Sequence, residues 1–217
     1  MYRSHRYTTL AFCVATLGLA FALYAQSGSR GRDDANAGGM QHESLRGQGL
    51  TSLYAADPIG RTMNFTDGAY GGVIQDYMVK NANSDIDFGG YLHNAFTVGI
   101  EGGREGAIVD LGLAATLGPR YGFEETVGGG QGYASIRLID GELHILADYE
   151  NQTTQPLAEA AQLVPGRNAA SVAVHAGHVY VVRIVDRHDQ SFELIVKFMV
   201  VEFRAGESVT LRWHRLK

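Results

Sequence analysis

The chain is almost free of cysteine. Its 217 residues include one, Cys13, which lies in an uncharged apolar segment at residues 8–25. The remainder therefore has no disulfide, no thiol nucleophile, no thiolate metal site and no iron–sulfur cluster. A domain without such cross-links depends on its hydrophobic core, and the roughly 150 residues left for one are enough.

Positive charge is also scarce. The chain has 18 Lys and Arg residues against 23 Asp and Glu, and the basic residues are scattered singly. Without Arg3 and Arg6 of the N-terminal segment, 16 basic residues remain and the net charge is near −7. Such a chain lacks the basic stripe that follows a phosphate backbone, so we expect no nucleic-acid partner.

The N-terminus has the features of an export signal. A short basic region precedes the apolar segment, and small residues follow at Ala25 and Ser27. This pattern predicts a signal peptide over residues 1–25 and a periplasmic, cell-surface or extracellular protein. The alternative is an uncleaved membrane anchor, because an apolar run of about eighteen residues is just long enough to span a bilayer.

The rest of the chain reads as a spacer followed by one β domain. Residues 26–53 lack apolar periodicity and are rich in Gly, Ser, Asn and Arg, which predicts a disordered spacer. In residues 54–217 short apolar runs alternate with Gly, Asn and Asp, a pattern typical of an all-β domain. Its eight or nine expected strands are too many for one flat sheet. We therefore predict an antiparallel two-sheet sandwich, or a partly closed barrel, with one short connecting helix at residues 156–163.

The strongest strand pattern is a closing meander at residues 178–186, 192–203 and 208–215. If Asp186 pairs with Phe192 and Phe203 with Ser208, one face of all three strands is apolar, whereas a slip of one residue would scatter apolar side chains over both faces. The predicted core face consists of Tyr180, Val182, Ile184, Leu194, Val196, Phe198, Val200, Leu211 and Trp213. The opposite face carries the polar set Arg183, Lys197, Arg212 and His214.

Other strands are predicted at residues 72–80, 85–88, 95–101, 106–113, 133–139 and 142–149. The last two form a hairpin through Asp140-Gly141, the dipeptide that a type I′ turn favours. This hairpin places Arg137 opposite His144.

Catalytic motifs are absent from the sequence: there is no G-x-S-x-G, H-E-x-x-H or S-x-x-K pattern. The glycine-rich residues 128–132 do not follow a predicted strand and open a helix, which excludes a phosphate-binding loop of that kind. Asp85 and Asp87 alternate on one strand and share a face, but a Ca²⁺ site needs more oxygen ligands. A carboxylate pair that meets only in space stays open, and with it a carboxylate-dependent hydrolase.

The candidate ligand residues are histidines. His175 and His178 flank an Ala-Gly turn before the first meander strand, and His93 lies in a glycine-containing loop at residues 89–94. Neutral imidazole binds Zn, Cu, Ni and haem iron, so these three are the candidate haem or metal ligands. The alternative is that Gly177 serves the turn and that both rings are merely half-exposed.

Several of these segments resemble the HmuY-like haem-binding family of exported bacterial proteins. The similar elements are a Tyr-centred strand at residues 177–183, a Lys-bearing strand at 195–198, an aromatic-ended strand at 209–213, and Asp-x-Asp-Phe at 85–88 with a later glycine pair at 102–103. The resemblance spans residues 60–215. It implies an all-β fold that holds haem through a pair of loop histidines.

Together these patterns predict an exported, non-catalytic β-sandwich that works as a binding or scaffolding domain of the cell envelope. Its expected partner is a small ligand or another envelope protein, with membrane contact only through an uncleaved signal. Two alternatives stay open: a haem-binding protein that uses a histidine pair, and the hydrolase.

Overall fold

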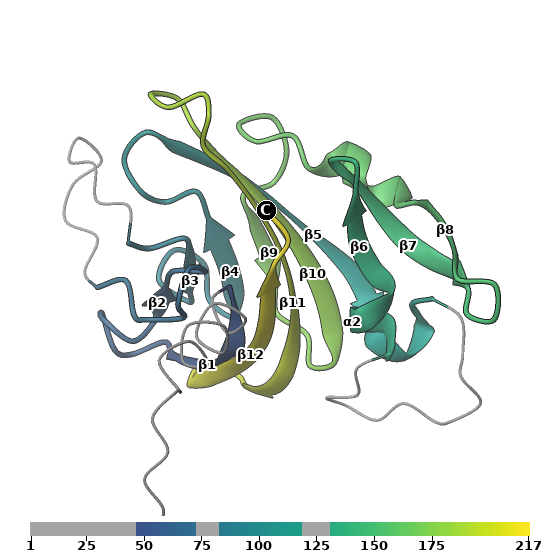
Figure 1. Ribbon diagram of the computed structural model, residues 1–217. Helices are drawn as coiled ribbons and strands as arrows, with labels where there is room; N and C mark the ends of the chain where they lie inside the picture. The colour runs from purple at the N-terminus through teal and green to yellow at the C-terminus, as the bar shows by residue number, and fades with distance from the viewer. Residues whose placement is uncertain (1–46, 73–82, 119–130) are drawn as a thin grey trace, which may run out of the picture. The chain divides into compact units, whose positions relative to one another are not determined.

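The structure is a computed structural model in which residues 47–72, 83–118 and 131–217 are described (Figure 1). The chain divides into two units, Met1–Asn36 and Ala37–Lys217, and every described residue belongs to the second. The predicted signal peptide, most of the predicted spacer and most of the strand expected at residues 72–80 lie outside the described residues. Within the described ranges, no helix is both long and apolar enough to cross a membrane.

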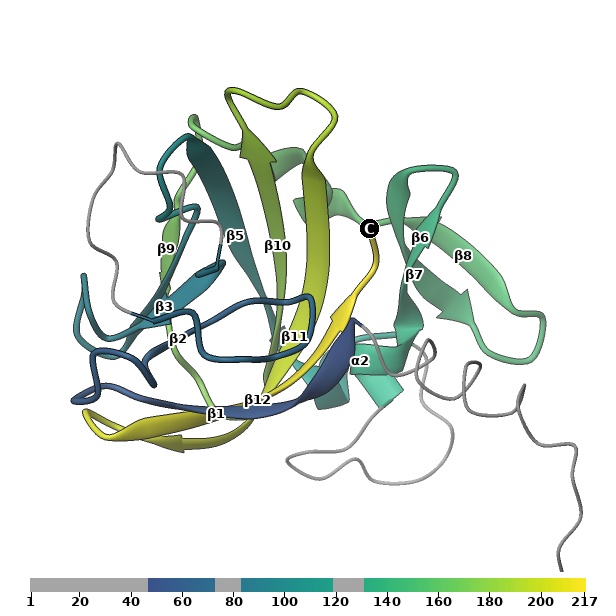
Figure 2. The same cartoon turned by 60° about the vertical axis from the view of Figure 1, so that its left-hand side comes forward.

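The described residues form three antiparallel sheets with very little helix, which confirms the predicted all-β sandwich. The number of sheets and strands is higher than expected, with twelve strands in the described ranges. The largest sheet lies between the other two in the layers of the fold (Figure 2). In order across this central sheet, its strands are β1 (Gln48–Tyr54), β12 (Ser208–Arg215), β11 (Glu193–Arg204), β10 (His178–Asp186) and β5 (Arg104–Leu113).

The register of the meander β10–β11–β12 agrees with the alternation of its apolar residues. Tyr180 pairs with Phe198, and Phe198 pairs with Trp213 on the other side. Only the end of the second hairpin differs from the prediction. A bulge between Val200 and Glu202 shifts the pairing, so that Phe203 meets Val209 instead of Ser208. An extra residue in one strand of a pair produces this shift.

We call the face of the central sheet that carries Tyr180 and Phe198 the inner face. The second sheet covers it, with strands β2 (Thr62–Met63), β3 (Ile86–Phe88), β4 (Ala95–Val98) and β9 (Ser171–Ala173). All nine residues predicted for the core face are buried in this layer. The Phe198 ring centroid lies 5.1 Å from those of Phe96 and Tyr180, so aromatic contacts dominate the layer.

We call the opposite side of the central sheet the outer face. A second apolar cluster covers part of it, formed by Val179, Val181 and Met199 of the central sheet together with Tyr133 and Ile136. The covering elements are the third sheet, β6 (Ile136–Ile139), β7 (Glu142–Asp148) and β8 (Thr153–Pro156), and three short helical segments, η1 (Ala114–Thr116), α2 (Gln131–Ser135) and η2 (Ala158–Gln162). The outer face is therefore a second packing surface over part of its area, which its alternation did not predict.

The β6–β7 hairpin has the predicted turn. Ile139 pairs with Glu142 and Arg137 with His144, and both turn residues have positive φ, 52° at Asp140 and 84° at Gly141. Type I′ turns require this combination.

Three local predictions differ from the structure. Residues 48–53, assigned to the spacer, form most of β1 and pair with β12, although only Leu53 of this strand is buried. The helix expected at 156–163 is the shorter 3₁₀ segment η2. The start of the strand expected at 133–139 is instead the end of α2. In each case the observed state depends on contacts distant in sequence, which local pattern does not encode.

Candidate functional site

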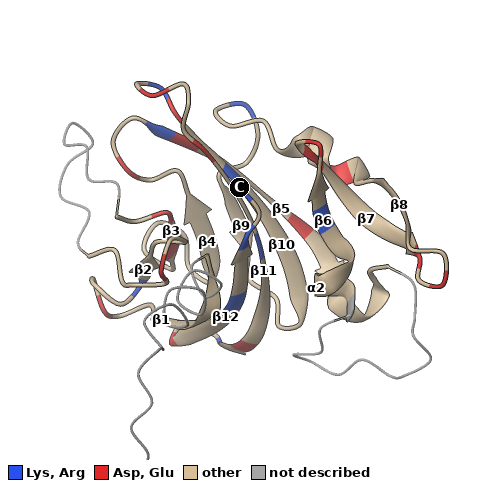
Figure 3. Ribbon diagram, in the orientation of Figure 1, with Lys and Arg blue, Asp and Glu red and all other residues tan. Residues whose placement is uncertain are grey.

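A row of polar side chains crosses the outer face where β1, β12 and β11 meet. Lys197 pairs with His214, which pairs in turn with Gln48 on the far side. In the next row Arg212 lies between Met199 and Leu50. Paired residues in an antiparallel sheet project to the same side, so this register gathers three basic side chains on one surface. Figure 3 marks the Lys and Arg positions along β11 and β12.

These side chains line a cavity of about 640 Å³ between the central sheet and α2. The volume lies within the range of small-molecule sites. Its described lining has no Asp or Glu, and consists of Gln48, Gly49, Leu50, Tyr133, Ala134, Lys197, Arg212, Trp213 and His214. Although acidic residues outnumber basic ones in the chain, the described lining of this cavity is basic and apolar.

Lys197 is the most deeply buried of these cations, with 5% of its surface exposed. Its Nζ donates to the carbonyl oxygens of Tyr133 and Ile136, at 2.8 and 2.7 Å, and so holds the end of α2 against β11. Tyr133 lies in the last turn of α2, where a nearby cation is favourable, and Ile136 is the first residue of β6. Burial, together with nearby Arg137 and Arg212, lowers the pKa of Lys197 to about 8.

Tyr133 brings a second element to the pocket from α2. Its ring centroid lies 4.7 Å from Lys197 Nζ and 5.0 Å from Arg212 Cζ, so both cations interact with the same π system. Burial raises the pKa of Tyr133, which therefore stays neutral. Burial and the neighbouring Lys197 lower the pKa of His214, which favours its neutral imidazole.

No carboxylate of the described residues neutralises the charge in the pocket. Among the described residues, neither Lys197 nor Arg212 forms an ion pair with a carboxylate. A basic side chain left without an anionic partner in a partly enclosed pocket attracts an anion from solution more strongly than one in bulk water.

The predicted histidines divide into a pair and a single residue. The His175 and His178 ring centroids lie 4.9 Å apart where the loop before β10 meets the strand, whose first residue is His178. His178 Nδ1 lies 2.9 Å from both carboxylate oxygens of Asp110, on β5. His93 makes no ring contact with either among the described residues. The carbonyl of its neighbour Asn94 accepts the Val174 N–H at 2.9 Å.

The separation of this pair bears on how the two rings can bind iron. Metal–imidazole bonds are about 2 Å long, so two rings on opposite sides of one metal ion have centroids roughly 6 Å apart. The 4.9 Å observed between His175 and His178 is shorter. The pair therefore does not have the spacing needed to hold a haem between its two rings.

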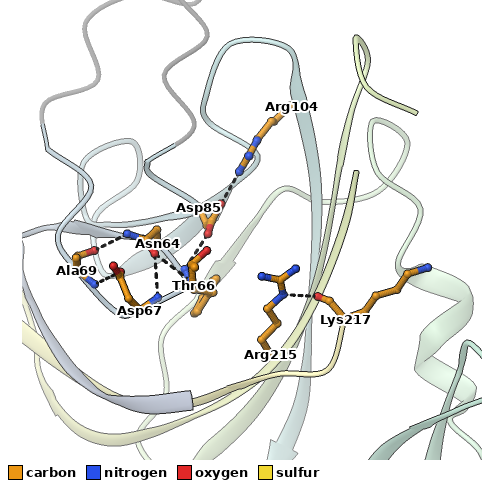
Figure 4. Close-up of polar contacts among 9 residues, drawn as sticks. Asn64, Thr66, Asp67, Ala69, Asp85, Arg104, Arg215 and Lys217 are labelled. Atoms are coloured by element: carbon orange, nitrogen blue, oxygen red, sulfur yellow. Dashed lines mark hydrogen bonds and ion pairs between the residues drawn. The ribbon is translucent and has the colours of Figure 1, made fainter. Parts of the chain in front are cut away.

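The two buried carboxylates at and beside β3 already have hydrogen-bond and ion-pair partners within the protein. Asp85 accepts the Phe65 N–H at 2.8 Å and an Arg104 N–H at 2.6 Å (Figure 4). Asp87 lies 2.9 Å from Arg61 Nε and accepts the Gly90 N–H at 2.7 Å. Burial raises the pKa of both, although each arginine favours the charged form. Each carboxylate has its own guanidinium partner, so these two do not form the open pair that the hydrolase alternative requires.

Two residues of these sites were not identified from the sequence. Tyr133 was placed on a strand, and its position over Lys197 depends on the α2 turn. Asp110 meets His178 only because β5 pairs with β10, 68 residues away along the chain. The polar set on the outer face was predicted, since Lys197, Arg212 and His214 alternate with the core residues of the meander.

Comparison of the chain with protein-family models, with curated proteins and with solved structures finds no match. The resemblance to the HmuY-like family therefore stays a prediction.

Proposed function

We propose that this chain is an exported, non-catalytic binding domain of the cell envelope, and that its ligand is a small amphipathic organic anion held in the Lys197 pocket. The supporting observation is a 640 Å³ cavity lined by Lys197, Arg212 and His214 and by no described carboxylate. An acidic group of a ligand would supply the counter-charge that the described residues do not.

The ligand is expected to be amphipathic because the pocket has two kinds of surface. Tyr133, Leu50 and Ala134 offer apolar contact, whereas the basic side chains come from the adjoining strands β11 and β12. Ligand sites commonly combine an apolar lining with a few polar groups that fix orientation. A charge-assisted hydrogen bond from Arg212 would hold the acidic end of the ligand, with its apolar body against Tyr133.

A pair of fluorescent probes tests this proposal. The probe 1-anilinonaphthalene-8-sulfonate has an anionic group on an aromatic body, and N-phenyl-1-naphthylamine has the same rings without the charge. We expect saturable one-site binding of the sulfonate probe at pH 7 and weaker binding of the neutral one. In Arg212→Ala the sulfonate probe should bind roughly ten- to a hundredfold more weakly, because a hydrogen bond to a charged group contributes about 1.5–3 kcal/mol.

Arg183→Ala is the matched control. Arg183 also projects from the outer face, but it is ion-paired with Glu193 at 2.7 Å and does not line this pocket. Its removal should leave binding of both probes unchanged. Equal affinity of the two probes for the wild type, or equal weakening in Arg183→Ala and Arg212→Ala, would contradict the proposal.

A further inference from the structure

We propose that the junction between β10 and the loop before it is a second, independent site, which binds one divalent late transition-metal ion such as Cu²⁺ or Zn²⁺ through His175 of the loop and His178, the first residue of β10. Asp110 acts as the positioning residue for His178. This site does not depend on the anion pocket. Asp110 pairs with Tyr180, a residue of the inner face, whereas the pocket lies on the outer face.

The loop that carries the two histidines is held from several directions. The Tyr180 hydroxyl accepts the His175 backbone N–H at 2.9 Å and donates to the Ala173 carbonyl at 3.1 Å. Gly177 has a φ of 76°, and its N–H donates to the Val200 carbonyl at 2.8 Å. A backbone fixed in this way presents both rings without an added cost of ordering the loop.

The pairing of β5 with β10 is irregular at this point. The register shifts between His178 and Tyr180, so that His178 lies opposite Leu113 while Tyr180 lies opposite Asp110. Bulges of this kind change the direction of a side chain and are frequent beside functional sites. Here the bulged end of β10 brings His178 Nδ1 within hydrogen-bond distance of the Asp110 carboxylate.

Asp110 determines which nitrogen of His178 is free. A carboxylate is an acceptor only, so Nδ1 carries the proton and donates to Asp110. The lone pair then belongs to Nε2, the state in which imidazole binds a metal. A carboxylate behind a ligating histidine fixes the tautomer and raises the basicity of the ligand. The Nε2 lone pair of His178 is therefore free to bind a metal ion, and the exposed His175 lies beside it.

The ring separation fits two ligands on adjacent positions of one ion. With metal–nitrogen bonds of about 2 Å, the ring centroids should be roughly 4.5 Å apart for a right-angled pair and roughly 5.2 Å for a tetrahedral pair. The observed 4.9 Å falls between these values. Right-angled and tetrahedral arrangements are those of Cu²⁺ and Zn²⁺, both of which bind imidazole well.

The site offers two protein ligands. In the part of the chain that the structure describes, no group of three or more His, Cys, Asp or Glu side chains is arranged around a common metal position. Water would complete the coordination of the ion. We therefore expect an exchangeable metal and not a structural one that the fold requires.

Isothermal titration calorimetry of the full chain with Cu²⁺ and with Zn²⁺ tests the proposal. The wild type should bind one more equivalent than the double variant His175→Ala/His178→Ala. Each single variant should bind that equivalent at least tenfold more weakly. His188→Ala is the control, because His188 lies in the exposed turn between β10 and β11 and should not affect binding. Identical stoichiometry and affinity in the wild type and the double variant would overturn the proposal.

The role of Asp110 needs a separate comparison. Asp110→Ala should weaken Cu²⁺ binding by about ten- to a hundredfold, as removal of a carboxylate behind a histidine ligand usually does. Asp110→Asn should recover most of the affinity, because its amide oxygen can accept the same Nδ1–H bond. Equal affinities in the wild type and Asp110→Ala would remove the positioning role.

Haemin serves as the probe of ligand geometry. Because the two rings are spaced for adjacent positions, added haemin should not give the Soret band of a complex with both histidines as axial ligands. A Soret shift that depends on both histidines would show them on opposite sides of one iron and would overturn the adjacent arrangement.

Discussion

The two faces of the central sheet are built by alternate residues of the same strands, yet they differ in character. The inner face is filled by large apolar side chains, among them Tyr180, Phe198 and Trp213, all buried. On the outer face the apolar cluster covers only part of the surface, and the remainder holds Lys197 and Arg212 around a cavity. The inner face thus supplies packing that stabilises the fold, and the outer face leaves side chains available for a ligand.

The two layers also treat buried charge differently. In the inner layer the Asp85 carboxylate is compensated by Arg104 at 2.6 Å. On the outer face the Lys197 ammonium donates to two carbonyl oxygens, of α2 and β6, and contacts the ring of Tyr133, and it has no carboxylate partner among the described residues. Burial without an anionic partner disfavours the charged form, which accounts for the direction of its pKa shift. The comparison shows that the unfavourable burial of a charge is offset by an ion pair at Asp85 and not at Lys197.

The largest effect is expected from the inner face. Phe198→Ala removes a ring that contacts Phe96 and Tyr180, and should lower the free energy of unfolding by about 3–5 kcal/mol. Met199→Ala, at the next residue but on the outer face, should cost about 2 kcal/mol, because it removes fewer buried atoms than Phe198→Ala. Urea denaturation measures both. A loss in Met199→Ala as large as in Phe198→Ala would mean that the faces are equally well packed.

The next effect concerns the compensated charge. Arg104→Met leaves the Asp85 carboxylate buried without its cation, and should cost on the order of 3 kcal/mol. The double variant Asp85→Asn/Arg104→Met should recover part of this loss, because no buried charge remains. If thermal unfolding shows the double variant to be as unstable as the sum of the single ones, the pair is not coupled.

A smaller effect is expected from the uncompensated charge. The pKa of Lys197 falls from its ordinary 10.5 to about 8 in the folded protein, so between these values the unfolded chain binds more protons. The penalty for burying the cation is complete below pH 8 and fades as the pH rises toward 10.5. The stability of the wild type relative to Lys197→Met should therefore increase by on the order of 2 kcal/mol between pH 7 and pH 10.

Urea denaturation of both proteins across this pH range gives the difference directly. Titration of other groups, such as the buried Tyr133, affects both proteins and cancels. A difference that stays constant, or that decreases with rising pH, would show that Lys197 is not held in a depressed state.

The sequence predicted those parts of the fold that depend on strict alternation. The meander paired as expected up to Val200 because only one register buries Tyr180, Val182 and Phe198 together. Beyond it, the bulge could not be predicted, since no residue type in that segment requires one. β1 was missed because Leu53 is its only buried residue, and its stability comes from pairing with β12.

The candidate sites likewise contain residues that the sequence predicted and others that depend on contacts distant in sequence. The basic residues of the outer face follow from alternation on β11 and β12, and were predicted. The cavity beside them was not, because it depends on how α2 covers the sheet. His175 and His178 were expected as neighbours, whereas Asp110 required knowledge of the β5–β10 pairing.

The most direct test of the central claim is the pH dependence of sulfonate-probe binding in the wild type and in Lys197→Met. If the outer face holds an anion through the Lys197 cation, the affinity of the wild type should fall about tenfold or more as the pH rises through about 8, where Lys197 loses its proton. The affinity of Lys197→Met should be lower and should change little over the same range. An affinity of the wild type that does not change between pH 7 and pH 9, or the same pH profile in both proteins, would contradict the account.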